Sequence, residues 1–419
     1  MLDRKTPPPF VQHTSLQLLK PEIQHLKNGG RIFFIEGGEQ EVLKVECVFQ
    51  AGKWFEPEPG VSHFTSSLLT RGTASRSSLE ISNQFDFYGI HTETLPGFDF
   101  SSFSLYGLTR NFPPVLDLVI DIISGASFPE KELLQAKDIF IQGLKINLEK
   151  TSYLASRQFR KVMFGEAHPY GYDIEESNAH NLHRNQLIDF RDRYFRDFTV
   201  YVSGKLTSPV KDELYRAFAR LPYSPVQPEA QITIPEDEVT QMVDKEGSVQ
   251  ASLRIGKGSV GRNHPDYAGL LLLNHILGGF FGSRLMKNIR EEKGLTYGIH
   301  SSIHALKHAS YFVVGADVNR ENRETAIAEI KKEFARLRHE SISPEELETA
   351  RNHFIGSIQS ELNTPFAHAD KIKLIDLFGL HEEYFTQLIH SMVAITPAQL
   401  LQLANRHLHE KGMVTVSVG

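Results

Sequence analysis

The sequence predicts an α+β fold that is built as two similar halves, on three observations. Runs with the alternation of β-strands are mixed with longer runs at helical spacing along the whole chain. The strand-like segment 102–107 recurs as 310–315, and a long amphipathic helix is predicted after each copy. The helix start at Pro129 recurs at Pro344. Repetition at this interval indicates the duplication of a domain rather than a short-period solenoid.

Regular structure is predicted to begin near Leu26, after a Pro-rich and then polar lead-in over residues 1–25. Asn28-Gly29-Gly30 is a turn signal, and the run after it, Arg31 to Glu36, has the composition of a strand. The patterns that follow predict a second strand at Glu41–Ala51, a helix after Gly60, a helix over residues 113–127 and a helix opened by Pro129.

Two lobes are expected, over residues 26–224 and 237–419, each a mainly antiparallel sheet covered by helices. The segment 225–236 between them is predicted to be a linker because it contains three prolines, at positions 225, 228 and 235. A chain of 419 residues is too long for one ordinary hydrophobic core, which agrees with a division into domains.

Composition and charge exclude several classes of protein. Hydrophobic residues make up 40% and charged residues 23%, as in soluble globular proteins. The formal charge is −6 with both signs interspersed, which argues against a nucleic-acid partner. The N-terminus has no apolar signal segment, and no run of about 18 apolar residues follows. A cytoplasmic protein with no membrane partner is therefore expected.

Cys47 is the only cysteine, so the chain cannot form a disulfide within itself or a zinc site built on several thiolates. Its neighbours read Val-Glu-Cys-Val-Phe, the pattern of a buried strand. We therefore expect Cys47 to be a packing residue rather than a nucleophile.

The first half carries motifs that resemble the opening of a pitrilysin/insulinase-type zinc peptidase. They are Leu26-x-Asn28-Gly29, the segment 51–56 (Ala-Gly-Lys-Trp-Phe-Glu), and the segment 60–73, which contains Gly-Val-Ser-His-Phe and ends in Thr-Arg-Gly-Thr. The resemblance extends over roughly residues 26 to 419. It implies that the two lobes enclose a chamber, and that the helix after Gly60 corresponds to the family's metal-binding helix.

In that family this helix carries His-x-x-Glu-His, in which the histidines bind zinc and the glutamate activates the zinc-bound water. A second glutamate about 75 residues later completes the site. Here the motif reads His63-Phe64-Thr65-Ser66-Ser67, and the distal position falls near Gln142. Hydroxyl and amide groups are poor zinc ligands, and Ser66 cannot act as a carboxylate base. We expect no metal in this chain, and we interpret His63 as a hydrogen-bonded helix residue.

Two other patterns in the sequence have features of ligand sites. His300, His304 and His308 recur every four residues, but in a strand such positions lie about 13 Å apart and cannot share a metal. A row of surface histidines is the better interpretation. The segment 256–261 matches the glycine pattern of dinucleotide-binding loops, but the acidic residue expected about 20 positions later is missing. We therefore expect no nucleotide cofactor.

The second half retains a segment that closely resembles the family's glycine-containing loop and its Arg-x6-Tyr pair. The loop contains Gly278, Gly279, Gly282 and Ser283, and the pair is Arg290 and Tyr297. In relatives the pair faces the zinc and helps to hold substrate. An arginine offers a fork of donors, and a tyrosine hydroxyl can donate to a developing oxyanion.

Structural alternatives stay open for this segment. Arg290 could cap a helix and Tyr297 could be half-buried packing. Gly282-Ser283 could allow close backbone approach or merely close a helix–helix contact. Arg284 is expected to be structural.

A lost zinc site combined with a retained Arg/Tyr segment resembles the non-catalytic subunits of two-chain family members. The resemblance implies a zinc-free subunit of a heterodimeric oligopeptidase, with zinc held by a homologous partner subunit. Such a subunit would bind peptide substrates as an added strand and supply Arg290 and Tyr297 to the partner's active site. Peptidase activity is then expected only in the mixed complex.

Two alternatives remain. One is a zinc-free peptide-binding or scaffold protein of the same fold, a homodimer included. The other is an enzyme that uses unfamiliar metal ligands.

Overall fold

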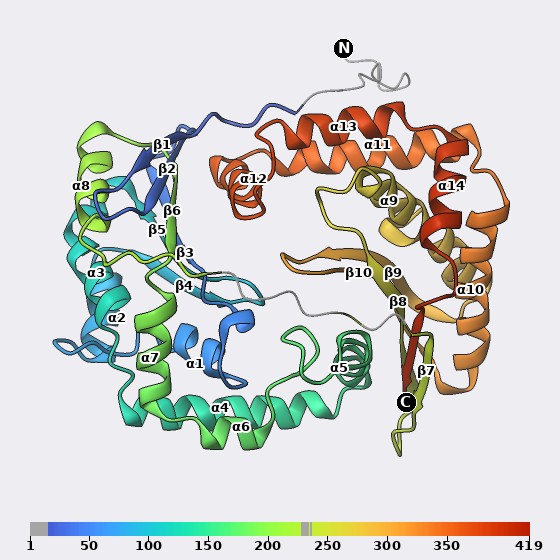
Figure 1. Cartoon of the computed structure of the whole chain (residues 1–419), viewed down its shortest axis with the longest axis horizontal. Helices are drawn as coiled ribbons and strands as arrows, with labels where there is room; N and C mark the ends of the chain where they lie inside the picture. Colours follow the sequence, from blue (N-terminus) through green and yellow to red (C-terminus); the bar gives the residue numbers. More distant parts are fainter. Residues whose placement is uncertain (1–15, 228–233, 235–236) are drawn as a thin grey trace, which may run out of the picture.

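The computed structural model describes residues 16–227, 234 and 237–419, and it shows two lobes with one sheet each (Figure 1). The N-terminal lobe has a six-stranded sheet in the order β1-β2-β6-β3-β5-β4. The C-terminal lobe has a five-stranded sheet in the order β7-β11-β8-β10-β9. The strands of the first sheet are β1 (Glu22–His25), β2 (Arg31–Glu36), β3 (Val42–Phe49), β4 (His91–Pro96), β5 (Ser101–Leu108) and β6 (Phe198–Gly204). Those of the second are β7 (Val239–Val243), β8 (Gln250–Ser259), β9 (Thr296–Ala305), β10 (Ser310–Asn319) and β11 (Val414–Val418).

The two sheets share one topology, which confirms the predicted duplication. Apart from β1, each strand of the first sheet has a counterpart at the same place in the second. In each sheet a single pair is parallel, β2 with β6 and β7 with β11, and the other pairs are antiparallel. The predicted α+β class with mainly antiparallel sheets is therefore confirmed.

Helices cover the sheets. In the N-terminal lobe they are α1 (Val61–Ser67), α2 (Ser78–Phe87), α3 (Leu116–Gly125), α4 (Glu130–Leu148), α5 (Thr151–Phe164), α6 (Glu176–Asn181), α7 (Arg184–Tyr194) and α8 (Ser208–Phe218). In the C-terminal lobe they are α9 (Tyr267–Asn274), α10 (Arg323–His339), α11 (Pro344–Glu361), α12 (Pro365–Leu377), α13 (Tyr384–Ala394) and α14 (Pro397–His407). Two wider, π-helical segments follow α9, namely η4 (His275–Gly279) and η5 (Met286–Glu292).

Several element boundaries differ from the sequence-based expectation. Regular structure begins at Glu22, inside the expected lead-in, because residues 22–25 pair with β2 across the turn at Asn28-Gly29. The helix expected over residues 113–127 starts with a 3-10 turn at Pro113–Val115, since consecutive prolines withhold two N–H donors. Residues 1–15 of the lead-in, and residues 228–233 and 235–236 of the expected linker, lie outside the described residues.

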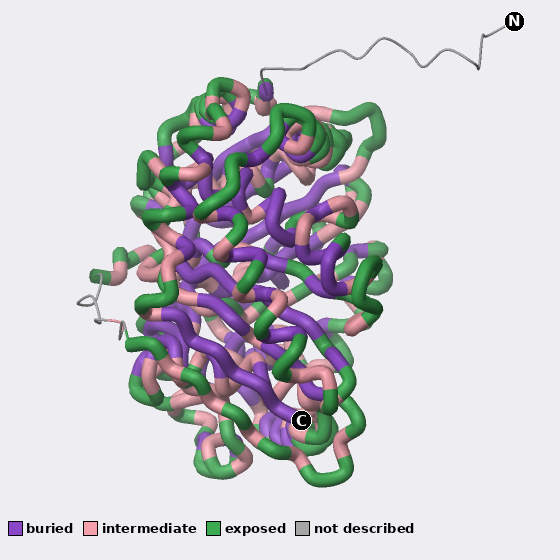
Figure 2. The backbone as a smooth tube through the Cα atoms, turned by 90° about the vertical axis from the view of Figure 1, so that its right-hand side faces the viewer, coloured by how far each residue is buried: buried purple, intermediate pink, exposed green. Residues whose placement is uncertain are grey.

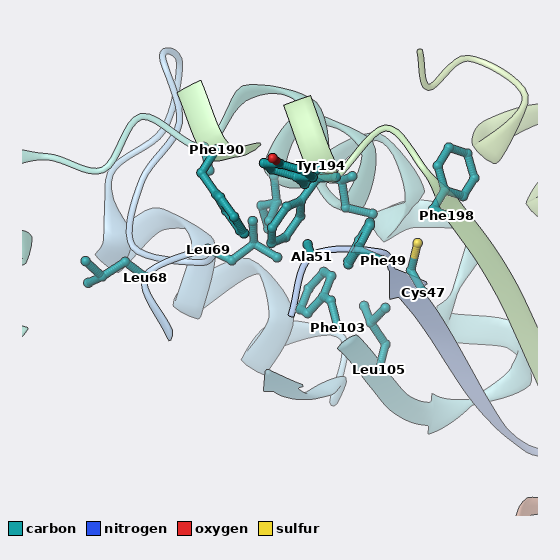
Figure 3. Packing of buried hydrophobic residues seen from close by; sticks show 14 of the residues in the cluster. Cys47, Phe49, Ala51, Leu68, Leu69, Phe103, Leu105, Phe190, Tyr194 and Phe198 are labelled. Atoms are coloured by element: carbon teal, nitrogen blue, oxygen red, sulfur yellow. The ribbon is translucent and has the colours of Figure 1, made fainter. Parts of the chain in front are cut away.

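Cys47 lies in the core of the N-terminal lobe, as expected. Its side chain is fully buried on β3, among aromatic and aliphatic residues such as Phe49, Phe103 and Phe198 (Figure 3). Burial raises the pKa of the Cys47 thiol well above its ordinary value, which disfavours a nucleophilic thiolate. The burial-coloured trace shows long buried stretches in the chain, and the central strands β3, β6 and β10 are buried over most of their length (Figure 2).

Each lobe sends one helix across to cover the other lobe's sheet. Helix α5 packs on β8 and β11, and helix α12 packs on β6 and β2. In Figure 1 the two helices lie at the lower and upper margins of the space between the sheets. Both are the third long helix after the equivalent strands β5 and β10, so the exchange is reciprocal. It explains why β3 and β6 are buried on both faces instead of alternating.

Polar contacts fix this exchange. The Arg31 guanidinium on β2 forms a bidentate pair with the Asp376 carboxylate on α12, at 2.6 and 3.0 Å. The Tyr201 hydroxyl on β6 donates to the same carboxylate at 2.6 Å. At the other crossing, the Arg254 guanidinium on β8 donates to the Ser156 hydroxyl on α5 at 3.1 Å. The lobes are therefore joined by packed helices in both directions.

None of the helices in the described residues is long and apolar enough to span a lipid bilayer.

Candidate functional site

Helix α1, which carries the altered zinc motif, is anchored at its first turn. Gly60 precedes it with φ of 102°, in the left-handed region that glycine adopts without steric cost. The Glu56 carboxylate accepts the backbone N–H groups of Gly60 and Ser62, both at 3.0 Å. These bonds satisfy donors that a helix start leaves unpaired, and they place His63 one turn further along.

His63 lies half-buried on α1, against the Phe64 and Phe140 rings, each with its centroid at 5.3 Å. Within the described residues it makes ring contacts and no hydrogen bond, so the expected hydrogen-bonded role is wrong. Its position against two phenyl rings is the reason, because neither ring offers an acceptor. Burial lowers the pKa of His63, which keeps the imidazole neutral.

Ser66, at the position of the catalytic glutamate, points into the lobe. Its hydroxyl is buried and donates to the Ser101 hydroxyl on β5 at 2.9 Å. Ser101 donates in turn to the carbonyl oxygen of Ala51 at 2.7 Å, which also accepts from Ser62 at 2.8 Å. This network connects α1 to the sheet. The base position of the family motif has therefore become a packing and hydrogen-bonding contact.

The remaining two positions of the altered motif, Ser67 and Gln142, have different surroundings from His63. Ser67 borders a polar pocket of about 330 Å³ between α2 and the edge strand β4, whereas His63 lines a different pocket. Gln142 is exposed on α4, next to the buried Ile141. Across residues 16–227 and 237–419, no group of three or more His, Cys, Asp or Glu side chains could hold a metal ion.

The zinc that the fold family implies does not fit the residues present here. One neutral imidazole, the hydroxyl of Ser67 and the amide of Gln142 cannot replace two imidazoles and a carboxylate.

The pocket beside His63, about 230 Å³ in volume, contains charged groups that the sequence analysis did not select. The Lys53 ammonium group donates to the carbonyl oxygen of Tyr172 and lies 4.0 Å from the centroid of its ring. The Tyr172 hydroxyl donates to Glu56 at 2.8 Å. Lys53 and Glu56 stood inside the quoted segment 51–56, but no local signal pointed to Tyr172, about 115 residues further on.

Burial dominates the electrostatics of this pocket. It raises the pKa of Glu56 to about 7 and lowers the pKa of Lys53 to about 8. The Asp173 carboxylate, also in the pocket wall, is held by Arg160 at 2.5 Å and by Arg157 at 3.5 Å. Lys53, Glu56 and Asp173 therefore each have a partner within the described part of the chain.

In the C-terminal lobe the glycine-containing loop packs tightly against its surroundings. A Cβ atom on Gly278 would lie 2.8 Å from the backbone nitrogen of Ser301, and one on Gly279 would lie 2.6 Å from the imidazole of His275. Gly282 faces the Phe280 ring, and the buried Ser283 donates its N–H to the carbonyl oxygen of Phe280 at 3.1 Å. Close backbone approach is thus made by Gly278, and Gly282-Ser283 closes the loop on itself.

Arg284 has the structural role that was expected. Its guanidinium forms a bidentate ion pair with Glu346 at 2.7 and 2.8 Å. Glu346 lies in the first turn of α11, where the helix dipole stabilises its negative charge. Arg284 therefore ties the glycine-containing loop to α11.

Arg290 and Tyr297 lie together at the edge of the second sheet. The Arg290 guanidinium carbon is 5.3 Å from the centroid of the Tyr297 ring and 4.7 Å from that of Phe281. Tyr297 is 92% exposed, so the alternative of a half-buried packing residue is wrong. Phe281, also exposed, was missed because no sequence signal marks a phenylalanine in a loop.

A bulge in β9 explains why Tyr297 projects into solvent. Thr296 pairs with Val318 and Ile299 with Ala316, so β9 carries one extra residue here. The Thr296 hydroxyl donates to the carbonyl oxygen of Asp317 at 2.6 Å and accepts from the N–H of Gly298 at 3.2 Å. Such bulges redirect a side chain away from the sheet surface. The edge of the C-terminal sheet is thus shaped to present Tyr297.

Comparison with known proteins accounts for this arrangement. Residues 35–165 match the family model described as Insulinase (Peptidase family M16), and residues 181–354 match the model described as Peptidase M16 inactive domain. The chain belongs to the M16 peptidase family. The match to the insulinase model lies in the first lobe, and the match to the inactive-domain model extends from the first lobe into the second.

Relatives cover most of this M16 chain at low identity. The uncharacterized zinc protease YmxG of Bacillus subtilis is 23% identical over 354 residues, which are 83% of this chain and 85% of that protein. A peptidase M16 inactive domain from Pseudomonas fluorescens is 24% identical with a TM-score of 0.88, covering 96% of this chain and 98% of that one. A protease from Helicobacter pylori is 19% identical with a TM-score of 0.87, covering 96% and 100%. The solved structures establish the fold.

Proposed function

We propose that this chain is the non-catalytic subunit of a heterodimeric, zinc-dependent oligopeptidase. It binds peptide and supplies Arg290 and Tyr297 to the active site of a homologous, zinc-bearing partner subunit. The chamber and the cytoplasmic location that the sequence analysis expected are part of this proposal.

One contrast carries the proposal. In the N-terminal lobe, the general-base position of the motif is a buried serine hydrogen-bonded to Ser101. In the C-terminal lobe, Tyr297 is held out in solvent beside Arg290 by a bulge of its own strand. A large exposed aromatic side chain next to a cation favours contact with something outside the chain. The N-terminal lobe therefore lacks the carboxylate that the family motif uses as a base. The C-terminal lobe keeps the Arg290 and Tyr297 side chains of the family's substrate-facing pair, with Tyr297 accessible from outside.

The edge strands supply a place for an extended peptide. Strand β4 is the outer strand of the first sheet and alternates between exposed and half-buried residues. It lies beside α1, the helix of the altered motif. The unpaired backbone groups of an edge strand can accept an added strand. The edge position of β4 beside α1 therefore supports the same proposal.

Mixing experiments test the complementing role. We expect no peptide cleavage by this chain alone, and cleavage after mixing with a homologue that carries an intact His-x-x-Glu-His motif. Zinc content, measured in each purified component, should follow the homologue. Cleavage with stoichiometric zinc in the isolated chain would instead show an active enzyme with unfamiliar ligands. Absence of cleavage in every mixture would favour the peptide-binding or scaffold role.

Substitutions in the mixed complex test the residues. Arg290→Gln and Tyr297→Phe should each lower kcat/KM by about 100-fold, the usual effect of removing one transition-state donor. Co-purification of the two subunits should be unchanged. Arg193→Gln is the matched control, because Arg193 is an exposed arginine stacked on a single ring, that of Tyr194 on α7. Full activity of both Arg290 and Tyr297 variants would contradict the proposed role.

A further inference from the structure

The faces of the Arg290 guanidinium are occupied, whereas its N–H donors are free. Two ring centroids lie within cation–π distance of its central carbon, that of Phe281 at 4.7 Å and that of Tyr297 at 5.3 Å. An arginine that stacks on rings keeps its N–H groups in the guanidinium plane, pointing outward. In the described part of the chain these N–H groups form no hydrogen bond and no ion pair.

Arg290 differs from three nearby cations, because each of these has a carboxylate partner within the lobe. Three nearby ion pairs show this: Arg284 with Glu346, Lys293 with Glu329, and Arg336 with Glu333. These three carboxylates are therefore committed to other partners. Within the described residues the Arg290 guanidinium contacts two aromatic rings and no carboxylate, which leaves its N–H groups available to an anion from outside the chain.

We propose that Phe281, Arg290 and Tyr297 form a carboxylate-binding subsite for the bound peptide. The carboxylate is that of the peptide's C-terminus or of an acidic side chain. The inference rests on the proposed function, because the same surface is there assigned to peptide, and it adds the chemical class that the surface recognises.

A carboxylate fits this site better than a peptide carbonyl. Two parallel N–H groups of a guanidinium match two carboxylate oxygens, and the pair cancels both charges. A carbonyl oxygen would accept one bond and leave the charge of Arg290 unmatched. The exposed rings also restrict water around the ion pair and offer apolar surface to a neighbouring side chain, since Phe281 is 63% exposed.

Phe281 acts through Arg290 and is a positioning residue. It lies in the glycine-containing loop, whose course is fixed by the close approach of Gly278 to Ser301 and by the Arg284–Glu346 pair. The loop therefore presents the ring at a defined place, against which the guanidinium rests. Losing the ring would free the arginine to rotate without removing its charge.

Binding of matched peptides to the whole chain tests the inference. The probe is a fluorescein-labelled octapeptide pool in four forms: free acid or C-terminal amide, each with Glu or Gln at one fixed internal position. We expect the dissociation constant to rise about tenfold or more when the recognised carboxylate is removed. Weaker binding of the C-terminal amide would identify the terminal carboxylate as the recognised group. Weaker binding of the peptide with Gln would identify an acidic side chain. Equal binding of all four forms, or binding of none, would overturn the inference.

Variants separate the subsite from general effects on folding. Arg290→Gln should abolish the preference for the carboxylate form, and Arg290→Lys, which keeps the charge without the fork, should restore part of it. Phe281→Leu should weaken binding of the carboxylate form more than binding of the neutral form, a difference that a merely structural role would not produce. Arg193→Gln should keep the full preference. The thermal midpoint should be the same in all four, because the altered side chains are on the surface.

The outcome is independent of the complementation test. Carboxylate preference in the isolated chain without cleavage in any mixture would sustain the subsite and reject the heterodimeric peptidase. Cleavage in the mixture with no carboxylate preference in the chain would sustain the heterodimeric peptidase and reject the subsite.

Discussion

The indole ring of Trp54 lies face to face with the imidazole of His308, with centroids 3.9 Å apart and planes 12° from parallel. Trp54 belongs to the N-terminal lobe and His308 to the turn between β9 and β10 of the C-terminal lobe. The contact continues through the backbone: the N–H of Lys307 donates to the Asp99 carboxylate at 2.9 Å, and that of His308 donates to the Tyr170 hydroxyl at 3.3 Å. The tip of the hairpin is thus inserted into the first lobe.

This contact also corrects the expectation for the histidine row. His300 and His304 lie exposed on β9, as a surface row requires, but His308 is drawn into the interface between the lobes. Its Nε2 atom is buried without a partner among the described residues. The position was misjudged because the chain turns directly after Ala305 and the turn meets a lobe that lies far away in sequence.

Trp54 is the only tryptophan of the chain, so its fluorescence reports on this contact. Burial lowers the pKa of His308, Asp99 opposes the shift, and Lys307 adds to it. The native state therefore holds neutral His308, while the unfolded state takes up a proton below pH about 6.5. We expect stability to fall as the pH drops below this value, with a change in tryptophan emission.

His308→Gln should remove most of the pH-dependent emission change between pH 4 and 7. His304→Gln is the matched control, since His304 stacks on Tyr311 rather than on Trp54. His168 also approaches Trp54, edge-on with centroids 5.5 Å apart, and burial lowers its pKa as well. If His168→Gln alone abolished the transition, the assignment to His308 would be wrong.

A second prediction concerns the helix exchange. Asp376→Ala should lower the free energy of unfolding by about 2 kcal/mol, because it removes a charged acceptor from Arg31 and from the buried Tyr201 hydroxyl. Asp370→Ala on the same helix should cost about 1 kcal/mol or less, since Asp370 is half-exposed and its partners Lys44 and Lys373 both keep Glu46. Denaturation followed by circular dichroism would compare them. Equal losses would contradict the role given to Asp376.

A third prediction concerns pH and Glu56. Its carboxyl group keeps its proton up to pH about 7 in the folded chain, whereas an unfolded glutamate releases it near 4.5. The folded state binds more protons between these values, so this group's contribution makes stability fall as the pH rises from about 4.5 to 7. Glu56→Gln should flatten the curve of thermal midpoint against pH in that window. Glu58→Gln, at an exposed position nearby, should leave the curve as in the wild type.

A fourth prediction concerns the metal. Restoring the family motif by Ser66→Glu and Ser67→His should not give stoichiometric zinc after dialysis, because the third ligand position still carries an exposed amide, Gln142. The change at Ser66 should also lower the thermal midpoint, since it puts a carboxylate where a buried hydroxyl bonds Ser101. Ser67→His alone serves as the control for stability. One zinc per chain in the double variant would show that the remaining positions suffice.

The sequence by itself determined the duplicated architecture, because hydrophobic periodicity and turn residues are local signals. Strand β2 was predicted at Arg31–Glu36, where the structure has it, and the packing role of Cys47 followed from its apolar neighbours. The altered zinc motif was likewise readable, since its ligands are defined by residue type at fixed spacing along one helix.

Only the tertiary structure decided what those residues contact. The direction of Ser66 toward Ser101, the stacking of Trp54 on His308 and the placing of Phe281 beside Arg290 each join segments that no local pattern connects. The exposure of Tyr297 depends on a bulge set by pairing with β10, and the burial of β3 on both faces depends on a helix from the other lobe. Burial and charge pairing are sums over such distant neighbours, so the chemistry of a site follows from the fold rather than from the motif that marks it.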